Sequence, residues 1–263
     1  MPAAGIAMNL VMTMGTRTIM EMGIRTDIPT ITTTNMTTEA LTPEQFQRLQ
    51  TWFGASFPIG AFSYSHGLEA AFEAGLVTDR AGLTDWIEGL LLFGSARNDA
   101  ILFCAAHRAF PDAAAVAELA AALSPSMELR AETLNQGEAF LKAVAQGWPS
   151  LNTSLWNDEL FFGGSIALPI AAAACCAAAS IPCKPALLAY LHGFAANIVS
   201  AALRSIPVGQ SAGLSVQAAL ESAIATAADQ AMAASLDDIG SASPMLDWLS
   251  ATHETQYSRL FRS

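Results

Sequence analysis

The stretch LFFGGSIALPIAAAACCAAASIPCKPALLAYLHGFAANIVSAAL (residues 160–203) decides the fold. Its one charged residue is Lys184, and most of the remainder is alanine, leucine and isoleucine. A helix that is apolar on every side has to be covered on every side. The stretch therefore predicts two helices, one on each side of Pro182, that are buried in a protein core and at a possible subunit contact.

The same stretch allows a second interpretation, a two-span integral membrane protein. Residues 160–183 and 185–203 are each long enough to cross a bilayer. However, the composition is mostly alanine, with Gly163, Pro169, His192 and Asn197 inside the apolar runs, and neither aromatic belts nor a basic cluster flank them. These features favour the buried core and predict no membrane association.

Helical signals continue on both sides of the stretch. Thr42, Pro43 and Gln45 form the pattern of a capping box with proline at the first helical position. A stripe at helical spacing follows Asp79 (Leu83, Trp86, Ile87, Leu90 and Leu91), and one helix is expected over 211–235. No long run alternates apolar with polar residues. The sequence predicts an all-α protein, a single-domain bundle of about ten helices over residues 41–263.

Charge and cysteine usage restrict the class of protein. The net charge is −11, so a nucleic-acid partner, which requires a basic face, is not expected. The four cysteines lie in alanine-rich runs and predict buried thiols of a reducing compartment, which indicates the cytoplasm. Residues 1–40 are rich in Met and Thr and contain no signal-peptide pattern. We expect a disordered extension or an upstream start codon there.

One group of residues suggests a metal site. Cys175, Cys176, Cys183 and His192 offer thiolate and imidazole ligands, and a direct nickel-binding metallochaperone is therefore an alternative. Adjacent cysteines on a helix point about 100° apart, unlike the C-x-x-C pairs of structural zinc sites. The sequence therefore favours buried, inert thiols and predicts no metal site.

Catalytic motifs are sparse. His66 lies among Ser63, Tyr64 and Ser65, but neighbours in sequence are weak support for a catalytic triad, and hydrogen bonding within a turn is the preferred interpretation. The chain contains no phosphate-binding G-x-x-x-x-G-K-[ST] loop and no H-E-x-x-H motif. We expect a protein that is not an enzyme and that binds no cofactor.

The chain ends with THETQYSRLFRS (residues 252–263), although chain ends usually fray. Tyr257 and Phe261 are four residues apart, so the segment could form one helical turn with an apolar side. Either this tail folds back on its own core, or its docking creates a binding surface for another protein. The second interpretation is preferred, since aromatic and arginine side chains dominate interface energetics.

Two further positions carry specific expectations. Gly137, in the middle of a predicted helix from Ser126, costs about 1 kcal/mol relative to alanine, so another backbone should approach it closely. Arg204 precedes the sequence SIPVGQ at the end of an apolar helix. There it can satisfy terminal carbonyls or contact a partner.

Four motifs in order, FPIGAFSYSHGLE (57–69), SMELRAETLNQG (126–137), RSIPVGQ (204–210) and HETQYSRLFRS (253–263), resemble the UreF family of urease accessory proteins. The resemblance implies an all-helical homodimer that matures urease without being a catalyst. It implies three partners: UreD (UreH in some organisms), the GTPase UreG and apo-urease. The protein would act as a chaperone in nickel insertion.

The resemblance also implies a binding site. Tyr257, Ser258, Arg259, Leu260, Phe261 and Arg262 would form the segment that becomes ordered at the UreD contact. The loop that contains Phe62, Tyr64 and His66 would be its neighbour. Where members of the family have a histidine and a glycine, this chain has Ala167 and Ala173, so a nickel-handling role for that histidine is not expected here.

Overall fold

The computed structural model describes residues 40–123, 126–151, 166–205, 209–240, 248–249 and 260–262. Their regular secondary structure is helical throughout, which confirms the predicted all-α class. Of the segment 1–40, predicted to be a disordered or upstream-start extension, residues 1–39 lie outside the described residues. The α-helices are α1 (Pro43–Trp52), α2 (Leu68–Glu73), α3 (Arg80–Phe93), α4 (Ser95–Ala109), α5 (Ala114–Ala122), α6 (Met127–Gly147), α7 (Leu168–Ala178), α8 (Cys183–Ser205), α9 (Gln210–Ala219) and α10 (Glu221–Ala233).

Side-chain caps fix where several of these helices begin. Thr42 and Gln45 form the predicted capping box of α1, with hydrogen bonds of 2.9 and 3.3 Å between each side chain and the other residue's backbone N–H. The Asp79 carboxylate accepts from the Gly82 N–H at 2.9 Å, and the Ser126 hydroxyl accepts from the Leu129 N–H at 3.1 Å. Each cap satisfies a backbone donor that the first turn leaves without a partner.

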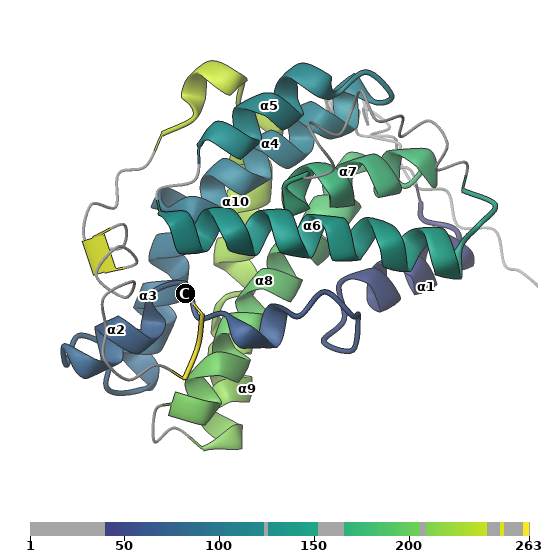
Figure 1. The fold of residues 1–263 in the computed structure, drawn as a ribbon. Helices are drawn as coiled ribbons and strands as arrows, with labels where there is room; N and C mark the ends of the chain where they lie inside the picture. Colours follow the sequence, from purple (N-terminus) through teal and green to yellow (C-terminus); the bar gives the residue numbers. More distant parts are fainter. Residues whose placement is uncertain are drawn as a thin grey trace, which may run out of the picture. The chain divides into compact units, whose positions relative to one another are not determined.

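The alanine-rich α7 lies at the centre of the core, between α4 and α6 (Figure 1). Eight of its eleven residues are buried, as the apolar stretch predicts. Small side chains let neighbouring backbones approach, and a Cβ added to Gly137 in α6 would overlap the Ile166 carbonyl oxygen. The expected close approach at Gly137 is confirmed. The Thr133 hydroxyl of α6 accepts from the Leu168 N–H at 3.1 Å and caps the start of α7.

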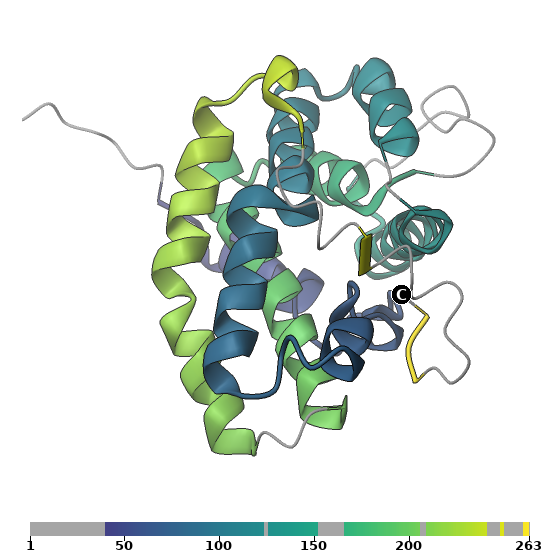
Figure 2. The ribbon, with the colours of Figure 1, turned by 90° about the vertical axis from the view of Figure 1, so that its left-hand side faces the viewer.

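Helix α8 is the second element of the predicted pair. It packs against α4, α7, α9 and α10, and Figure 2 shows α10 running alongside α3 and α4. Lys184, the charged residue of the apolar stretch, lies at the start of α8 and pairs with Asp229 of α10. The prediction of two buried helices is confirmed for α7, whereas half of the apolar window of α8 is buried.

In the described part of the chain, two helical segments are long and apolar enough to cross a membrane, by length and composition alone. They are the stretch Arg80–Ala109, which combines α3 and α4, and α8. Only half or slightly more of each segment's apolar window (56% and 50%) is buried. In the described part of the first span suggested by the sequence, α7 is eleven residues long, about half the length that a bilayer requires.

The structure departs from the sequence in the region 211–235. The single helix expected there is two helices, α9 and α10, which break at the fully buried Leu220. Helix α9 packs on α8 and α3, whereas α10 crosses α4, α3 and α8. Neither glycine nor proline marks the break, so it follows from packing around Leu220 rather than from a local signal.

An aromatic cluster explains why the loop after α1 contains so many rings. The Phe57 ring lies 5.1 Å from the ring of Phe140 in α6, centroid to centroid. The Trp52 ring makes edge contacts with Phe140 at 6.2 Å and Trp148 at 5.4 Å. The cluster buries the Phe57 side chain, whereas Phe62, further along the same loop, is exposed.

Candidate functional site

The loop between α1 and α2 has an unusual backbone conformation that determines the direction in which its side chains point. Gly60 and Gly67 adopt left-handed conformations (φ 72° and 74°), and so does His66 (φ 53°), although it is not glycine. A short 3₁₀-helix, Ala61–Ser63, lies between these positions. The turn at His66 directs its ring inward, against the Phe194 ring of α8 at 4.7 Å. Strained φ values of this kind persist where the surrounding contacts hold them.

The end of the chain lies against this loop. The Glu69 carboxylate, at the start of α2, accepts from the Leu260 N–H at 2.7 Å and from the Phe261 N–H at 3.1 Å. The Arg262 N–H donates to the Ser63 carbonyl at 2.8 Å. Three successive peptide groups of the tail are thus bound by one short stretch of the chain. Hydrogen bonds to an ionised acceptor are about twice as strong as neutral ones.

Buried and exposed side chains alternate along the docked segment: Leu260 and Arg262 are exposed, and Phe261 between them is buried. Phe261 is buried (4% exposed), and the Arg204 guanidinium of α8 lies 4.7 Å from the centre of its ring. The Arg204 Nε–H also donates to the Ser200 carbonyl at 3.2 Å. Arg204 therefore performs the helix-end role expected from the sequence and, in addition, holds the tail through a cation–π contact.

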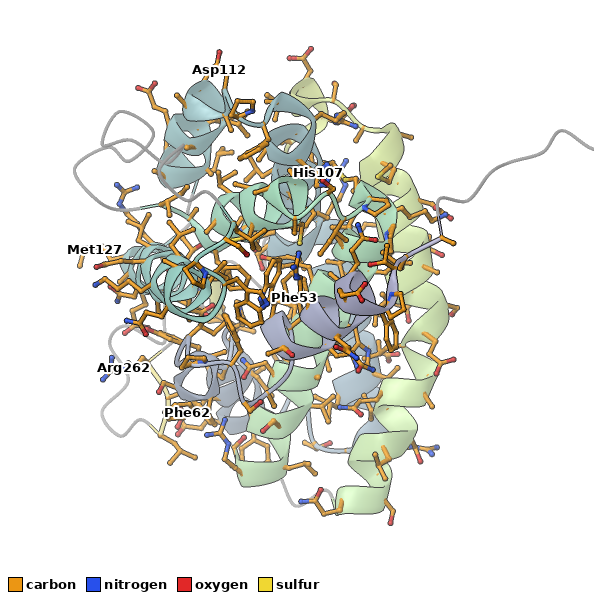
Figure 3. All side chains as sticks on the ribbon, turned by 90° about the vertical axis from the view of Figure 1, so that its right-hand side faces the viewer. Phe53, Phe62, His107, Asp112, Met127 and Arg262 are labelled. Carbon is orange, nitrogen blue, oxygen red and sulfur yellow. The ribbon has the colours of Figure 1, made fainter. Side chains whose placement is uncertain are left out.

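Three exposed side chains define what we term the tail–loop surface: Phe62, Leu260 and Arg262. Phe62 is 67% exposed and Leu260 is 62% exposed, which is unusual for large apolar groups. Figure 3 shows Phe62 and Arg262 at the same edge of the helical domain. Aromatic, aliphatic and arginine groups gathered beside an anchored backbone have the composition of a protein interface.

Beneath this surface lies a buried polar pair. The His66 Nε2 and the Glu132 Oε1 of α6 are 3.0 Å apart, and the Gln136 amide donates to the same Glu132 oxygen at 3.0 Å. His66 and Glu132 line the shared wall of two cavities of about 250 and 170 Å³. The partner of His66 therefore comes from a helix distant in sequence, and the expectation of bonding within the turn is wrong.

The pKa values of Asp99 and His66, which both line the larger cavity, are raised above their ordinary values. The Tyr190 hydroxyl donates to the Asp99 carboxylate at 3.0 Å. Burial raises the pKa of Asp99 from 3.8 to about 6, and the bond from Tyr190 only partly opposes that rise. Burial alone would lower the pKa of His66, but the Glu132 carboxylate outweighs it and the pKa is raised. The cavity therefore holds a histidine that favours its protonated form.

The predicted partner-binding residues divide into three groups. Leu260, Phe261 and Arg262 lie against the loop, as the resemblance implied, but they are not helical. Phe62 is exposed beside them, whereas Tyr64 (5% exposed) and His66 point into the protein. Tyr257, Ser258 and Arg259 lie outside the described residues.

Sequence reasoning missed two carboxylates: Glu69, which holds the tail, and Glu132, which pairs with His66. Glu69 and Glu132 fall within quoted motifs, but nothing local indicates that their carboxylates face inward. The signal available was a single acidic residue in an otherwise apolar or small-residue segment, as with Glu69 in SHGLEAAF. A carboxylate in such a place is buried only when it is paired or hydrogen-bonded.

The thiolate and imidazole cluster considered from the sequence is not formed. Cys175 and Cys176 are fully buried, while His192 on α8 is exposed. Within the described ranges, no group of three or more His, Cys, Asp or Glu side chains is placed to hold a metal ion. Ala167 and Ala173, at the positions where a histidine and a glycine were expected, are both buried in the core.

Fold and site together define an all-α protein in which four separated motifs meet. The loop, α6, the end of α8 and the chain terminus are joined by Glu132, Glu69 and Arg204. Comparison with known proteins identifies the family to which a chain with these motifs belongs. The family model described as UreF matches residues 77–221. The chain belongs to the UreF family of urease accessory proteins.

Relatives cover most of the chain. It is 46% identical over 221 residues to the urease accessory protein UreF of Methylorubrum populi, across 82% of this chain and 98% of the relative. The protein of the same description from Rhodopseudomonas palustris (strain BisA53) is 45% identical, across 82% of this chain and 92% of its own length. The one from Magnetococcus marinus is 44% identical over 225 residues, across 82% and 96%.

Proposed function

We propose that this protein is a non-catalytic scaffold of urease maturation in the cytoplasm. It acts as a homodimer, binds UreD (UreH) through the tail–loop surface, and recruits the GTPase UreG so that nickel is inserted into apo-urease. The tail supplies Leu260 and Arg262 to the UreD contact, and the loop supplies Phe62. Tyr257, Ser258 and Arg259 continue the same surface.

One observation carries the proposal: the exposed Leu260 stands on a tail backbone that is hydrogen-bonded from beneath, and the loop to which this tail is bonded displays the exposed Phe62. Glu69 binds the peptide groups of Leu260 and Phe261, and Arg204 covers the Phe261 ring. Ordering the tail before a partner arrives reduces the entropy lost on binding. The exposed Leu260 and Phe62 side chains then provide an anchor for a complementary apolar pocket.

Co-purification with UreD tests this surface. Leu260→Asp should reduce UreD binding at least tenfold, because it places a charge at the centre of a desolvated contact. The matched control is Leu214→Asp on α9, since Leu214 is similarly exposed (68%, against 62% for Leu260) and takes no part in the hydrogen bonds that hold residues 260–262. Equal binding by the two variants, both folded by circular dichroism, would overturn the proposed surface.

Recruitment of UreG is tested separately. The complex of this chain with UreD should bind UreG in gel filtration, whereas deletion of residues 252–263 should abolish UreD binding and leave the truncated chain folded. If the truncated chain still co-elutes with UreD, the tail has no part in the assembly. If the intact complex fails to retain UreG with or without GTP, the scaffold role is wrong although the UreD contact stands.

A further inference from the structure

Two of the four cysteines lie in contact although they are far apart in sequence. The Cys183 Sγ, at the first residue of α8, is 3.8 Å from the Cys104 Sγ of α4, across 79 positions of the chain. The Cys104 Sγ also contacts the Met232 Sδ of α10 at 3.7 Å. Both thiols are free. A disulfide requires about 2.05 Å between sulfurs, so an approach of roughly 1.8 Å would join them.

The two thiols have different surroundings. Cys104 is completely buried, whereas Cys183 is half-buried and is the most accessible of the four. Cys183 begins a helix, where the peptide dipoles favour negative charge. The exposed Arg108 guanidinium is held nearby by the Met232 and Ala234 carbonyls at 3.3 and 3.4 Å. Lys184 follows directly in the sequence.

These surroundings distinguish Cys183 from the other cysteines. The hydrogen bond shared with Cys104 and the charge of Arg108 lower the pKa of Cys183. Burial raises the pKa of Cys175 and Cys176, and the bond with Cys183 raises that of Cys104. The nucleophile of thiol chemistry is the thiolate, which forms most readily in an electropositive and partly exposed place. The sequence-based expectation of four buried thiols does not hold for Cys183, which is half-buried.

We propose that Cys104 and Cys183 form a peroxide-sensitive thiol pair that closes to an intramolecular disulfide between α4 and the start of α8. The Cys183 thiolate attacks hydrogen peroxide, the O–O bond breaks, and hydroxide leaves and is protonated to water. Cys183 is then a sulfenic acid. The Cys104 sulfur attacks the Cys183 sulfur, the S–S bond forms, the S–O bond breaks, and the hydroxyl group leaves as water with the Cys104 proton.

The product fastens two core helices that also bear the site described above. Helix α4 carries Asp99 of the larger cavity, and α8 carries Arg204 beneath the tail. The inference does not depend on the proposed function, because it concerns the opposite end of α8. Closing a loop of this length should raise the midpoint of thermal unfolding, since a cross-link removes conformations from the unfolded chain.

Intact mass spectrometry tests the pair. The full chain, reduced and freed of reductant, should lose two hydrogen atoms with a small excess of hydrogen peroxide and regain them with dithiothreitol. Trypsin should then release the peptide 98–108, which holds Cys104, linked to the peptide that holds Cys183. The oxidised protein should also melt at a higher temperature than the reduced protein.

Variants assign the roles. Cys104→Ser should stop at one added oxygen on Cys183 that dimedone traps, and Cys183→Ser should react at least tenfold more slowly than the unmodified protein. Cys175→Ser is the matched control and should form the disulfide normally. Cys104→Ala replaces Cys104→Ser if the buried hydroxyl prevents folding. Loss of two hydrogens by Cys183→Ser, or no loss by the unmodified protein, would overturn the proposal.

Discussion

Gly137 determines how closely two core helices approach each other. Its missing side chain lets the backbone at Ile166 and Ala167 lie directly on α6, where Thr133 then caps α7. The cost of a glycine inside a helix, about 1 kcal/mol, is offset by this packing. The close approach was predictable from the sequence, because a glycine in mid-helix weakens the helix unless a neighbouring backbone needs the space. The identity of the approaching backbone was not, since it lies about thirty residues away in the chain.

Gly137→Ala should lower the free energy of unfolding by about 2–4 kcal/mol, because the added methyl group has to displace backbone rather than a flexible side chain. Urea denaturation measures the change. Gly147→Ala, in the same helix but with no atom within 4 Å of the added Cβ, should be neutral or stabilising by up to about 1 kcal/mol. Equal effects of the two substitutions would contradict the packing described for α6 and α7.

Asp99 makes stability depend on pH. Its pKa in the folded protein is about 6, above the value of 3.8 for the unfolded chain, so the folded state binds the proton more tightly. Stability should therefore rise as pH falls through 6, and the gain should be complete below about 4. Asp99→Asn keeps the hydrogen bond to Tyr190 without the charge, and it should stabilise the protein by about 1–3 kcal/mol at pH 8.

Chemical denaturation of both proteins from pH 4 to pH 8 measures this difference, which should vanish at the acidic end. Asp85→Asn on the exposed face of α3 provides the control and should not alter the pH profile. A constant difference between Asp99→Asn and the unmodified protein at every pH would show that the Asp99 carboxyl does not titrate in this range.

Among the elements, the docked tail is the one that the sequence described least well. It predicted an apolar tail, and the family resemblance implied a neighbour in the 57–67 loop, which is found. It did not predict the non-helical backbone or the role of Glu69, because both depend on groups almost 200 residues apart. The first residues of helices were predicted more accurately, because a capping hydrogen bond such as that of Thr42 or Asp79 joins residues only three positions apart.

Glu69→Gln should loosen the docked tail. An amide offers one acceptor oxygen and presents its NH₂ group to a second donor, so one of the two bonds to Leu260 and Phe261 is lost. Such a bond contributes about 1.5 kcal/mol, which corresponds to roughly tenfold faster hydrogen exchange at these two amides. Exchange measured by nuclear magnetic resonance checks the change.

Glu73→Gln, on the exposed side of the same short helix, is the matched control for Glu69→Gln. It should leave the exchange rates of Leu260 and Phe261 unaltered. Unchanged exchange in Glu69→Gln as well would mean that the carboxylate does not hold the tail in solution.

At the scale of the whole molecule, the apolar stretch 160–203 indicated a membrane protein or a buried core. In the structure its helices lie among α3, α4, α6 and α10, and eight of the eleven residues of α7 and half of the apolar window of α8 are buried. Composition settled the fold class because alanine-rich helices need close neighbours. The arrangement of those neighbours was beyond the sequence, as the break at Leu220 illustrates.

The unit Glu39–Ser263 should fold without the residues before it. Expressed alone and without detergent, it should be recovered in the soluble fraction with a midpoint of thermal unfolding within about 2 °C of that of the full chain, since the buried core described above lies within this unit. Differential scanning calorimetry of both forms makes the comparison. Recovery of the unit only in detergent would instead support the membrane interpretation of α8.

The Glu69 carboxylate grips the tail by its peptide groups and not by its side chains. The tail side chains can consequently be substituted while the hydrogen bonds to the backbone persist, except at Phe261, whose ring is buried. Related chains can thus change the exposed tail residues to suit their own partners and retain the docking of the tail backbone. Partner specificity can therefore evolve without a change in the helical domain.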